Sequence, residues 1–360
     1  MKKKQSSSTS STHRRSAKRG SSGSRRAPVP RTLLTLVLLF IGAIALFYFG
    51  DIHPTEWLPE ELANSIDSIL PESETALEGD AKIKAPLAAK EKDKLSQKNI
   101  TARDGELSVI VFDIGQGNAV FVQTPNGSTM LVDAGERTEQ NRLLQYLEDM
   151  GVTRIDAVVA THPHSDHIGG MRAVLSSFEI GDIYMPRVEH TTATYTQLLQ
   201  QIKDMGKKVH STKGGADVII SLDPAVEINV LAPLNDKYKS LNDYSIVLRI
   251  SYGDQAILLP GDAQSISENE MLQAEADQLP STVLLTGHHG SSTSTGDAFL
   301  DSVDPEIAII SCGEGNDYGH PHKEVLQRLK ERDISVYRTD QQGNIAVHFS
   351  QSDYQIVSER

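Results

Sequence analysis

Residues 162–167 read His-Pro-His-Ser-Asp-His and so gather three imidazoles and one carboxylate within six positions. Neutral imidazole and carboxylate groups are common ligands of zinc, and manganese and iron also accept them. Because successive side chains of an extended segment alternate in direction, His162 and His164 are expected to share one metal ion. Asp166 and His167 are then expected to reach a second, neighbouring ion. A solvated polar turn is the alternative, but the whole chain has only 12 histidines, which makes an accidental grouping a poor explanation.

One loop cannot close two coordination shells, so further ligands are expected from other segments. Four candidate side chains share one setting, because each follows an apolar run suited to a buried strand and has a glycine close by that lets the backbone turn. They are Asp133, Asp262, His288 and His289. Side chains that follow different strands can meet at one edge of a sheet and make a rigid site. For Asp262 taken alone, a helix N-cap is the competing interpretation.

The chain resembles the metallo-β-lactamase fold superfamily in motifs that follow one another in that family's order. The segments that carry this resemblance are 133–135, 162–170, 261–263 and 287–291. A narrower resemblance is to the extracellular hydrolase domain of the ComEC-type DNA-uptake proteins of bacterial competence. Its segments are 112–119, 242–248, 318–321 and 338–343. The similarity runs from residue 107 to residue 349, and the hexad at 162–167 is its most specific part.

This resemblance implies a fold and a set of metal ligands. The fold is an αββα sandwich, with two divalent ions at the edge between its two sheets. The implied ligands are His162, His164, Asp166, His167 and His288, with Asp262 as the bridge between the ions. The first two would hold the first ion, and the next three would hold the second. His289 is the alternative to His288, and Asp133 would support the ligands through hydrogen bonds.

Asn242 marks a departure from the wider superfamily. Many relatives supply a third imidazole to the first ion from this region, whereas the ComEC-type branch has asparagine there. Residues 240–245 contain no histidine, so Asn242 is expected to be a weak ligand or a contact for the substrate. The first position would then be poorer in nitrogen and more open, which weakens the preference for zinc at that position and leaves room for manganese. Zinc is the metal expected for the centre as a whole, with manganese as the alternative.

Two neighbouring cations would let a bridging water lose a proton near neutral pH, since bound zinc can lower the pKa of water to about 7. The hydroxide would attack a phosphorus or a carbonyl carbon, so no nucleophilic serine or cysteine is required. Asp166 is a candidate to orient that hydroxide or relay its proton. His320 is a candidate to protonate the leaving alkoxide or to bind a phosphate oxygen, with a helix N-terminal position as the alternative. Ser291 could donate a hydrogen bond to a substrate phosphate or simply cap a helix.

Periodicity predicts the strands and helices that would position these residues. Strand-like runs occur at 107–113, 119–124, 128–133, 155–160, 180–185, 280–286 and 306–311. Helical patterns occur at 137–150, 193–205 and 321–332. Gly151 is the expected C-cap of the first helix, and the short turns between the first three strands favour an antiparallel meander. Residues 106–360 are enough for one two-layered hydrolase domain with a sizeable core.

The N-terminal third predicts a location rather than a reaction. Residues 1–31 hold ten Lys and Arg and no acidic residue, which favours a disordered cytoplasmic tail. Residues 32–50 contain an uncharged apolar run that would span roughly 27 Å as a helix, enough to cross a bilayer core. The basic flank predicts a single-pass anchor with a cytoplasmic N-terminus and an extracytoplasmic hydrolase domain; a cleaved signal peptide is the alternative. Residues 51–105 are predicted to form a flexible linker.

Charge narrows the expected partners. The net charge of −13 includes +10 from the first 31 residues, which leaves −23 for the remainder. A domain with this much negative charge repels DNA, which is itself a polyanion. Metal ions and local contacts would therefore have to hold a phosphodiester substrate. The sequence therefore favours a membrane-anchored metal-dependent phosphodiesterase or nuclease, with single-stranded DNA as a candidate substrate and an uptake or envelope complex as a candidate partner. The alternatives are a hydrolase of a small ester (a phosphorylcholine-type diester, a lactone or a β-lactam) and a non-catalytic module that binds nucleic acid or wall polymer.

Overall fold

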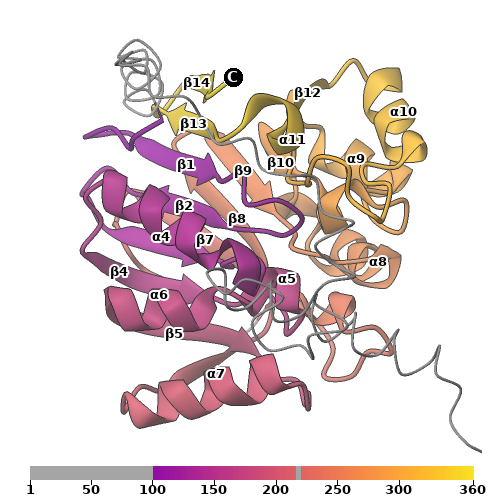
Figure 1. Ribbon diagram of the computed structural model, residues 1–360. Coiled ribbons are helices and arrows are strands. Elements are labelled where there is room, and N and C mark those ends of the chain that lie inside the picture. Colours follow the sequence, from indigo (N-terminus) through magenta and orange to yellow (C-terminus); the bar gives the residue numbers. More distant parts are fainter. Residues whose placement is uncertain (1–99, 216–219) are drawn as a thin grey trace, which may run out of the picture. The chain divides into compact units, whose positions relative to one another are not determined.

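The computed structural model describes residues 100–215 and 220–360, which are coloured in Figure 1. The predicted tail at 1–31, the predicted membrane helix at 32–50 and most of the predicted linker at 51–105 lie outside the described residues. Within the described ranges, no helix is long and apolar enough to cross a membrane. Ile100 is 5% exposed and packs into the core, so buried contacts begin within the segment predicted as a linker.

Two sheets form the centre of the domain, one of eight strands in the order β14-β13-β1-β2-β3-β4-β5-β6 and one of six in the order β12-β11-β10-β9-β8-β7. The first comprises β1 (Leu107–Val111), β2 (Val120–Gln123), β3 (Thr129–Val132), β4 (Arg154–Val159), β5 (Glu179–Pro186), β6 (Val209–Thr212), β13 (Ile345–Phe349) and β14 (Tyr354–Ser358). The second comprises β7 (Val226–Ala232), β8 (Val247–Tyr252), β9 (Gln255–Leu259), β10 (Val283–Leu285), β11 (Ile307–Ile310) and β12 (Ser335–Arg338). The predicted antiparallel meander is β1-β2-β3, whereas β3 to β6 and β9 to β12 run parallel.

Alternation along the strands explains why each sheet is covered on both faces. In β1, Val109 lies in the core between the two sheets, while its neighbour Ile110 lies under the helices of the first sheet. In β9, Ile257 faces the core between the sheets and Leu258 faces the helices of the second sheet. Successive side chains of a strand point to opposite faces, so a strand that is apolar at every position is buried on both. The architecture is the αββα sandwich that the resemblance implied.

Helices cover the two outer faces (Figure 1). On the first sheet lie α4 (Gln140–Asp149), α6 (Met171–Ser177) and α7 (Ala193–Asp204); on the second lie α8 (Ser265–Ala274), α9 (Asp297–Val303) and α10 (Lys323–Glu331). The helix predicted at 137–150 is a 3-10 turn, η1 (Arg137–Glu139), followed directly by α4. Gly151 follows α4 with φ 75°, the left-handed conformation expected of a C-cap glycine.

The carboxyl ends of β3, β4, β9, β10 and β11 carry the candidate site. Asp133 directly follows β3, the 162–167 hexad follows β4, and Asp262 follows β9. β10 leads into the 3-10 turn η4 (Gly287–Gly290), which contains both candidate histidines of that segment. Parallel strands share the direction of their carboxyl ends, so the loops of both sheets meet at one edge of the sandwich.

Gly170 allows the loop that follows the hexad to lie directly on the end of β3. A Cβ atom at Gly170 would come within 2.3 Å of the backbone oxygen of Ala134, so the backbone would have to shift. We expect Gly170→Ala to lower the free energy of unfolding by about 1–3 kcal/mol, the usual cost of overpacking. Ser177 is exposed at the end of α6, the helix that begins directly after Gly170, and Ser177→Ala should change stability by less than about 0.5 kcal/mol. Urea denaturation of both variants tests this, and equal stabilities would contradict the tight packing.

Candidate metal centre

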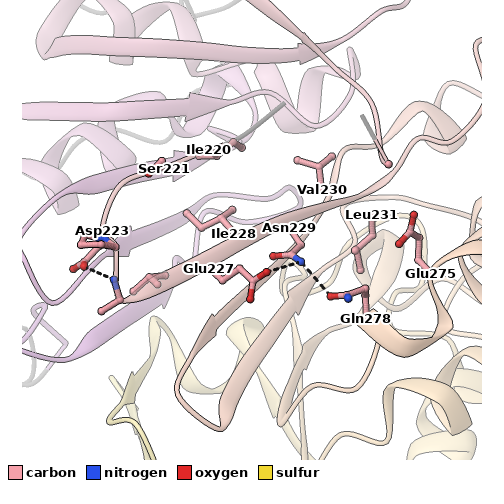
Figure 2. A pocket seen from close by; sticks show the side chains of 14 residues that line it. Ile220, Ser221, Asp223, Glu227, Ile228, Asn229, Val230, Leu231, Glu275 and Gln278 are labelled. Atoms are coloured by element: carbon pink, nitrogen blue, oxygen red, sulfur yellow. Dashed lines mark hydrogen bonds between the residues drawn. The ribbon is translucent and has the colours of Figure 1, made fainter. Parts of the chain in front are cut away.

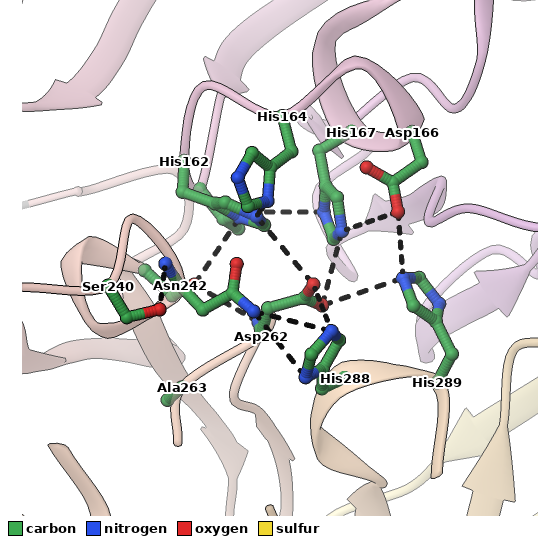
Figure 3. A network of polar contacts seen from close by, with 12 residues as sticks. His162, His164, Asp166, His167, Ser240, Asn242, Asp262, Ala263, His288 and His289 are labelled. Atoms are coloured by element: carbon green, nitrogen blue, oxygen red, sulfur yellow. Dashed lines mark hydrogen bonds and ion pairs between the residues drawn. The ribbon is translucent and has the colours of Figure 1, made fainter. Parts of the chain in front are cut away.

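The hexad follows β4 and leads into the short helix α5 (Ser165–Ile168), and its first two histidines belong to the first group of ligands (Figure 3). His162 is buried, and its Nε2 lies 3.0 Å from His164 Nδ1 and 3.6 Å from Asp262 Oδ2. The ligand atoms of these three residues lie within 4.8 Å of one another. Two imidazole nitrogens and one carboxylate oxygen at this separation can bind one divalent cation.

A second group of ligands lies beside the first and consists of Asp166, His167, Asp262 and His289. His167 Nε2 is 3.2 Å from Asp262 Oδ1. His289 Nε2 is 3.3 Å from Asp166 Oδ2 and 3.6 Å from Asp262 Oδ1. These four ligand atoms also lie within 4.8 Å of one another, which suits a second cation.

Asp262 belongs to both groups and is 1% exposed. Its Oδ2 faces His162 of the first group, and its Oδ1 faces His167 and His289 of the second. A carboxylate that turns one oxygen to each group has the geometry required of a bridge between two cations. Figure 3 shows this side chain between the two sets of imidazoles.

Three buried atoms of the second group make no hydrogen bond within the described part of the chain: His167 Nε2, His289 Nε2 and Asp262 Oδ1. A buried polar atom without a partner is costly, so these atoms fit a cation that they would coordinate. The other nitrogen of each imidazole is already engaged, since His167 Nδ1 lies 2.7 Å from Asp133 Oδ2 and His289 Nδ1 lies 3.0 Å from the backbone oxygen of Ser311. When each Nδ1 donates its proton there, each Nε2 presents a lone pair to the centre.

Asp133 supports the centre from behind, as the resemblance implied. Its side chain is fully buried, and its carboxylate accepts hydrogen bonds from the backbone N–H of Thr161 at 2.8 Å and from the Thr161 hydroxyl at 2.7 Å. Sequence reasoning missed Thr161, although its position immediately before His162 was a usable signal. Ser311 was missed for a different reason, because it contributes only a backbone oxygen.

The buried carboxylates of this centre create a negative potential that stabilises positive charge on neighbouring groups. Burial acts to raise the pKa of Asp262, but His167 and His289 hold that pKa well below its usual value. Burial acts to lower the pKa of His167, but Asp262 and Asp133 outweigh it and raise that pKa well above its usual value. The carboxylates around this centre therefore favour a positive charge between them. A bound cation would supply this charge.

The structure places His289 in the second group and not His288, the reverse of the order expected from the sequence. Both residues have left-handed backbone, with φ 52° and 56°. The His288 side chain is 22% exposed, with Nδ1 3.0 Å from Thr293 Oγ1 and Nε2 3.6 Å from Asp262 Oδ2. The His289 side chain is 2% exposed, because the Ser311 carbonyl anchors it inward.

Asn242 and Ser291 differ in how well they match their expected roles. Asn242 lies in the 3-10 turn η2 (Asn242–Tyr244) and is 6% exposed, with Nδ2 3.3 Å from His288 Nε2. Its Oδ1 is buried and makes no hydrogen bond within the described residues, which fits an atom that a cation would coordinate, although Asn242 is not among the residues that line the pocket. Ser291 is buried and does not line the pocket; its Oγ lies 3.0 Å from Thr293 Oγ1. Ser291 thus braces Thr293, and its contact with a substrate stays a prediction.

A pocket of about 310 Å³ opens over the two groups. It is lined by Gln116, His164, Ser165, Asp166, Asp262, His288, His289, Tyr318 and His320. His320 reaches it from the loop before α10, and burial together with His289 and His288 lowers the pKa of His320 to about 4. The ring is therefore neutral near pH 7, where it can donate one N–H to an oxygen in the pocket. Gln116 and Tyr318 were not candidates from the sequence, although both lie in segments that carried the narrower resemblance.

A larger hollow, of about 810 Å³, runs along the edge strand β7 (Figure 2). It shares no lining residue with the pocket over the metal groups. Its wall includes Asn229, whose Nδ2 donates hydrogen bonds to Glu227 and Gln278. Among the described residues, no cluster of metal-competent side chains lies there, and Gly215 and Ile220 at its border flank a segment outside the description. No site is assigned to this hollow.

Comparisons with known proteins agree with this geometry. The sequence profile of the metallo-beta-lactamase superfamily matches residues 112–314. ComE operon protein 3 of Bacillus subtilis (strain 168) is 32% identical over 263 residues, which cover 68% of this chain and 33% of that protein. Competence protein ComA of Neisseria gonorrhoeae is 32% identical over 240 residues, which cover 67% of this chain and 32% of that protein. The chain thus spans about a third of the length of these curated relatives.

Solved structures show more distant likenesses. CmlA, a diiron beta-hydroxylase from Streptomyces venezuelae, is 13% identical with a TM-score of 0.47, and the match covers 69% of this chain and 55% of that one. A diphosphatase of the PhnP family is 14% identical with a TM-score of 0.43, and the match covers 68% of this chain and 98% of the diphosphatase. With identities of 13% and 14% and TM-scores below 0.5, these similarities indicate nothing about the activity of this chain.

Proposed function

Because this chain belongs to the metallo-β-lactamase superfamily, we propose that it is a metal-dependent phosphodiesterase that cleaves single-stranded nucleic acid or a related phosphodiester. The observation that carries the proposal is Asp262, which turns one carboxylate oxygen to each of two ligand groups on the floor of an open pocket. A purely structural zinc site is closed and needs one ion, whereas this centre has two ligand groups and an accessible face. We expect zinc, with manganese as the alternative, because the ligands are imidazoles and carboxylates.

Hydrolysis requires the oxygen of a water to form a new P–O bond while the bond to one ester oxygen breaks. Two divalent cations, when bound, supply an activated water and neutralise charge on the phosphoryl oxygens. Asp166 lines the pocket and can accept a hydrogen bond from the attacking water, which keeps it oriented. His320, neutral at pH 7, can donate its N–H to a phosphoryl or leaving oxygen across the same pocket. The proton that the attacking water loses passes to solvent, and the leaving alkoxide takes up a proton from solvent.

The names of the relatives support a phosphodiester over an acyl substrate and suggest a cellular setting. One is named a competence protein and another, Recombination protein 2 of Haemophilus influenzae, is 28% identical over 257 residues. Competence and recombination are both processes that act on DNA, a polymer joined by phosphodiesters. We extend the proposal to a membrane-anchored enzyme whose domain lies outside the cytoplasm, held by a helix at 32–50 and associated with an uptake or envelope complex.

Metal analysis and two substrates test the proposal on the purified full chain. We expect about two zinc or manganese ions per chain, and metal-dependent cleavage of both bis-p-nitrophenyl phosphate and a single-stranded oligonucleotide. A chelator should abolish both activities, and added zinc or manganese should restore them. Asp166→Ala is the matched variant, because it removes one ligand of the second group and should lower both activities together.

Two other results would each lead to a different function. Two bound ions without cleavage of either phosphodiester would favour a hydrolase of a lactone, a β-lactam or another small ester. A metal-free, inactive chain that still binds nucleic acid or wall polymer would favour a non-catalytic binding module.

A further inference from the structure

Tyr318 is a large aromatic side chain that lines the pocket and yet remains 68% exposed. It is the most exposed of the five large hydrophobic side chains that are open to solvent in the described part of the chain. An exposed aromatic ring at the rim of a pocket with convergent polar groups is a typical ligand contact. Its position next to the metal groups sets it apart from exposed residues elsewhere, such as Ile266 on α8.

The loop that carries Tyr318 is held in place by a chain of hydrogen bonds. Asn316 Oδ1 accepts from the backbone N–H of His320 at 3.0 Å, and Asn316 Nδ2 donates to the backbone oxygen of His320 at 2.7 Å. His322 accepts from the backbone N–H of Ser292 at 3.0 Å through Nδ1, and its Nε2 lies 3.2 Å from the backbone oxygen of Tyr318. The exposed ring therefore projects from a braced backbone.

Three rings form a nearly parallel series from the metal centre to the solvent. The His289 and His320 centroids are 6.2 Å apart with planes at 23°, and the His320 and Tyr318 centroids are 5.6 Å apart with planes at 20°. The inner ring belongs to a metal-ligand group, and the outer ring is the exposed one. A flat aromatic group from the substrate would continue this series on the open side of Tyr318.

We propose that Tyr318 is a stacking platform for the nucleobase next to the scissile phosphodiester, which makes an unpaired nucleotide chain the preferred substrate. This inference rests on the proposed phosphodiesterase function. No Lys or Arg lines the pocket, and the chain beyond residue 31 carries a net −23, so affinity for a polyanion must come from metal ions and stacking. A base within a duplex has both faces covered, so only an unpaired base can use the platform.

Two oligonucleotides and two variants of the metal-loaded full chain test the platform. The probes are a single-stranded DNA with 2-aminopurine at one internal position and the same DNA with an abasic site there. We expect the wild type to quench the 2-aminopurine on binding, and to bind and cleave the base-bearing DNA with Kd and KM about tenfold lower than for the abasic DNA. Tyr318→Leu keeps apolar bulk without a ring, so its Kd and KM should be nearly the same for the abasic DNA as for the base-bearing DNA. Tyr318→Phe keeps the ring and should preserve the wild-type difference.

The outcomes separate this inference from the proposed function. Cleavage of DNA by Tyr318→Leu with the wild-type preference for the base-bearing probe would overturn the platform and leave the phosphodiesterase standing. No cleavage of DNA or of bis-p-nitrophenyl phosphate by the wild type would count against the phosphodiesterase itself. Loss of binding to a soluble wall glycan in Tyr318→Leu, with DNA binding unchanged, would overturn the platform in favour of a sugar contact. Metal content measured in each variant shows that the centre is intact.

Discussion

Asp262→Ala is expected to remove at least one of the two metal ions per chain and to lower turnover by about 10³-fold or more, since the ions supply several kcal/mol of transition-state stabilisation. Among the described residues, Asp262 alone belongs to both ligand groups, so its loss removes one oxygen ligand from each. It also leaves His162 and His167 without the carboxylate that faces both of them. Metal analysis of the purified variant and cleavage of bis-p-nitrophenyl phosphate measure the two effects.

Asp254→Ala is the matched control for this change. Asp254 is an exposed residue between β8 and β9, the strand that also leads to Asp262. This control should keep two ions and wild-type turnover, and circular dichroism should show the same fold for both variants. Unchanged metal content in Asp262→Ala would mean that this carboxylate is not a shared ligand, and the site would have to be rebuilt around other residues.

Local pattern was sufficient to predict most of the candidate site. The hexad at 162–167 brings its ligands together within one turn, so their proximity follows from chain connectivity alone. Asp133 and Asp262 were found because each lies at the end of an apolar run suited to a buried strand, and the carboxyl ends of neighbouring parallel strands share an edge. The sandwich itself follows from strands that are apolar on both faces, as in β1, where Val109 and Ile110 fill different cores.

Long-range contacts decided what local pattern could not. His288 and His289 are adjacent and have almost the same backbone conformation, so nothing near them in sequence distinguishes their side chains. The choice depends on the backbone oxygen of Ser311, which belongs to another strand end and holds His289 inward. The position of Ser291 depends on contacts of the same kind, because its hydroxyl meets that of Thr293 inside the loop. A backbone acceptor leaves no signature in the sequence.

Asp133→Asn is expected to weaken metal binding at the second group by about 10- to 100-fold, the usual effect of losing a partner that orients a ligand. The Asp133 carboxylate accepts three hydrogen bonds, two from Thr161 and one from His167 Nδ1. An asparagine can present one oxygen to the backbone N–H of Thr161, but its amide then donates where the carboxylate accepted. His167 Nδ1 would have to accept, its proton would move to Nε2, and the lone pair that faces the cation would be lost. Competition with a chromophoric chelator measures the affinity.

Backbone strain does not complicate this experiment, because asparagine tolerates the left-handed conformation that Asp133 adopts at φ 61°. Asp304→Asn makes the same change at φ 47° on an exposed residue after α9 and should leave metal affinity unaltered. If Asp133→Asn binds both ions as tightly as the wild type, the hydrogen bond to Asp133 does not set the proton on His167. Some other contact would then have to keep the lone pair of His167 Nε2 directed at the cation. The hydrogen bond from His167 to Asp133 would no longer distinguish the second group from an ordinary buried pair of imidazole and carboxylate.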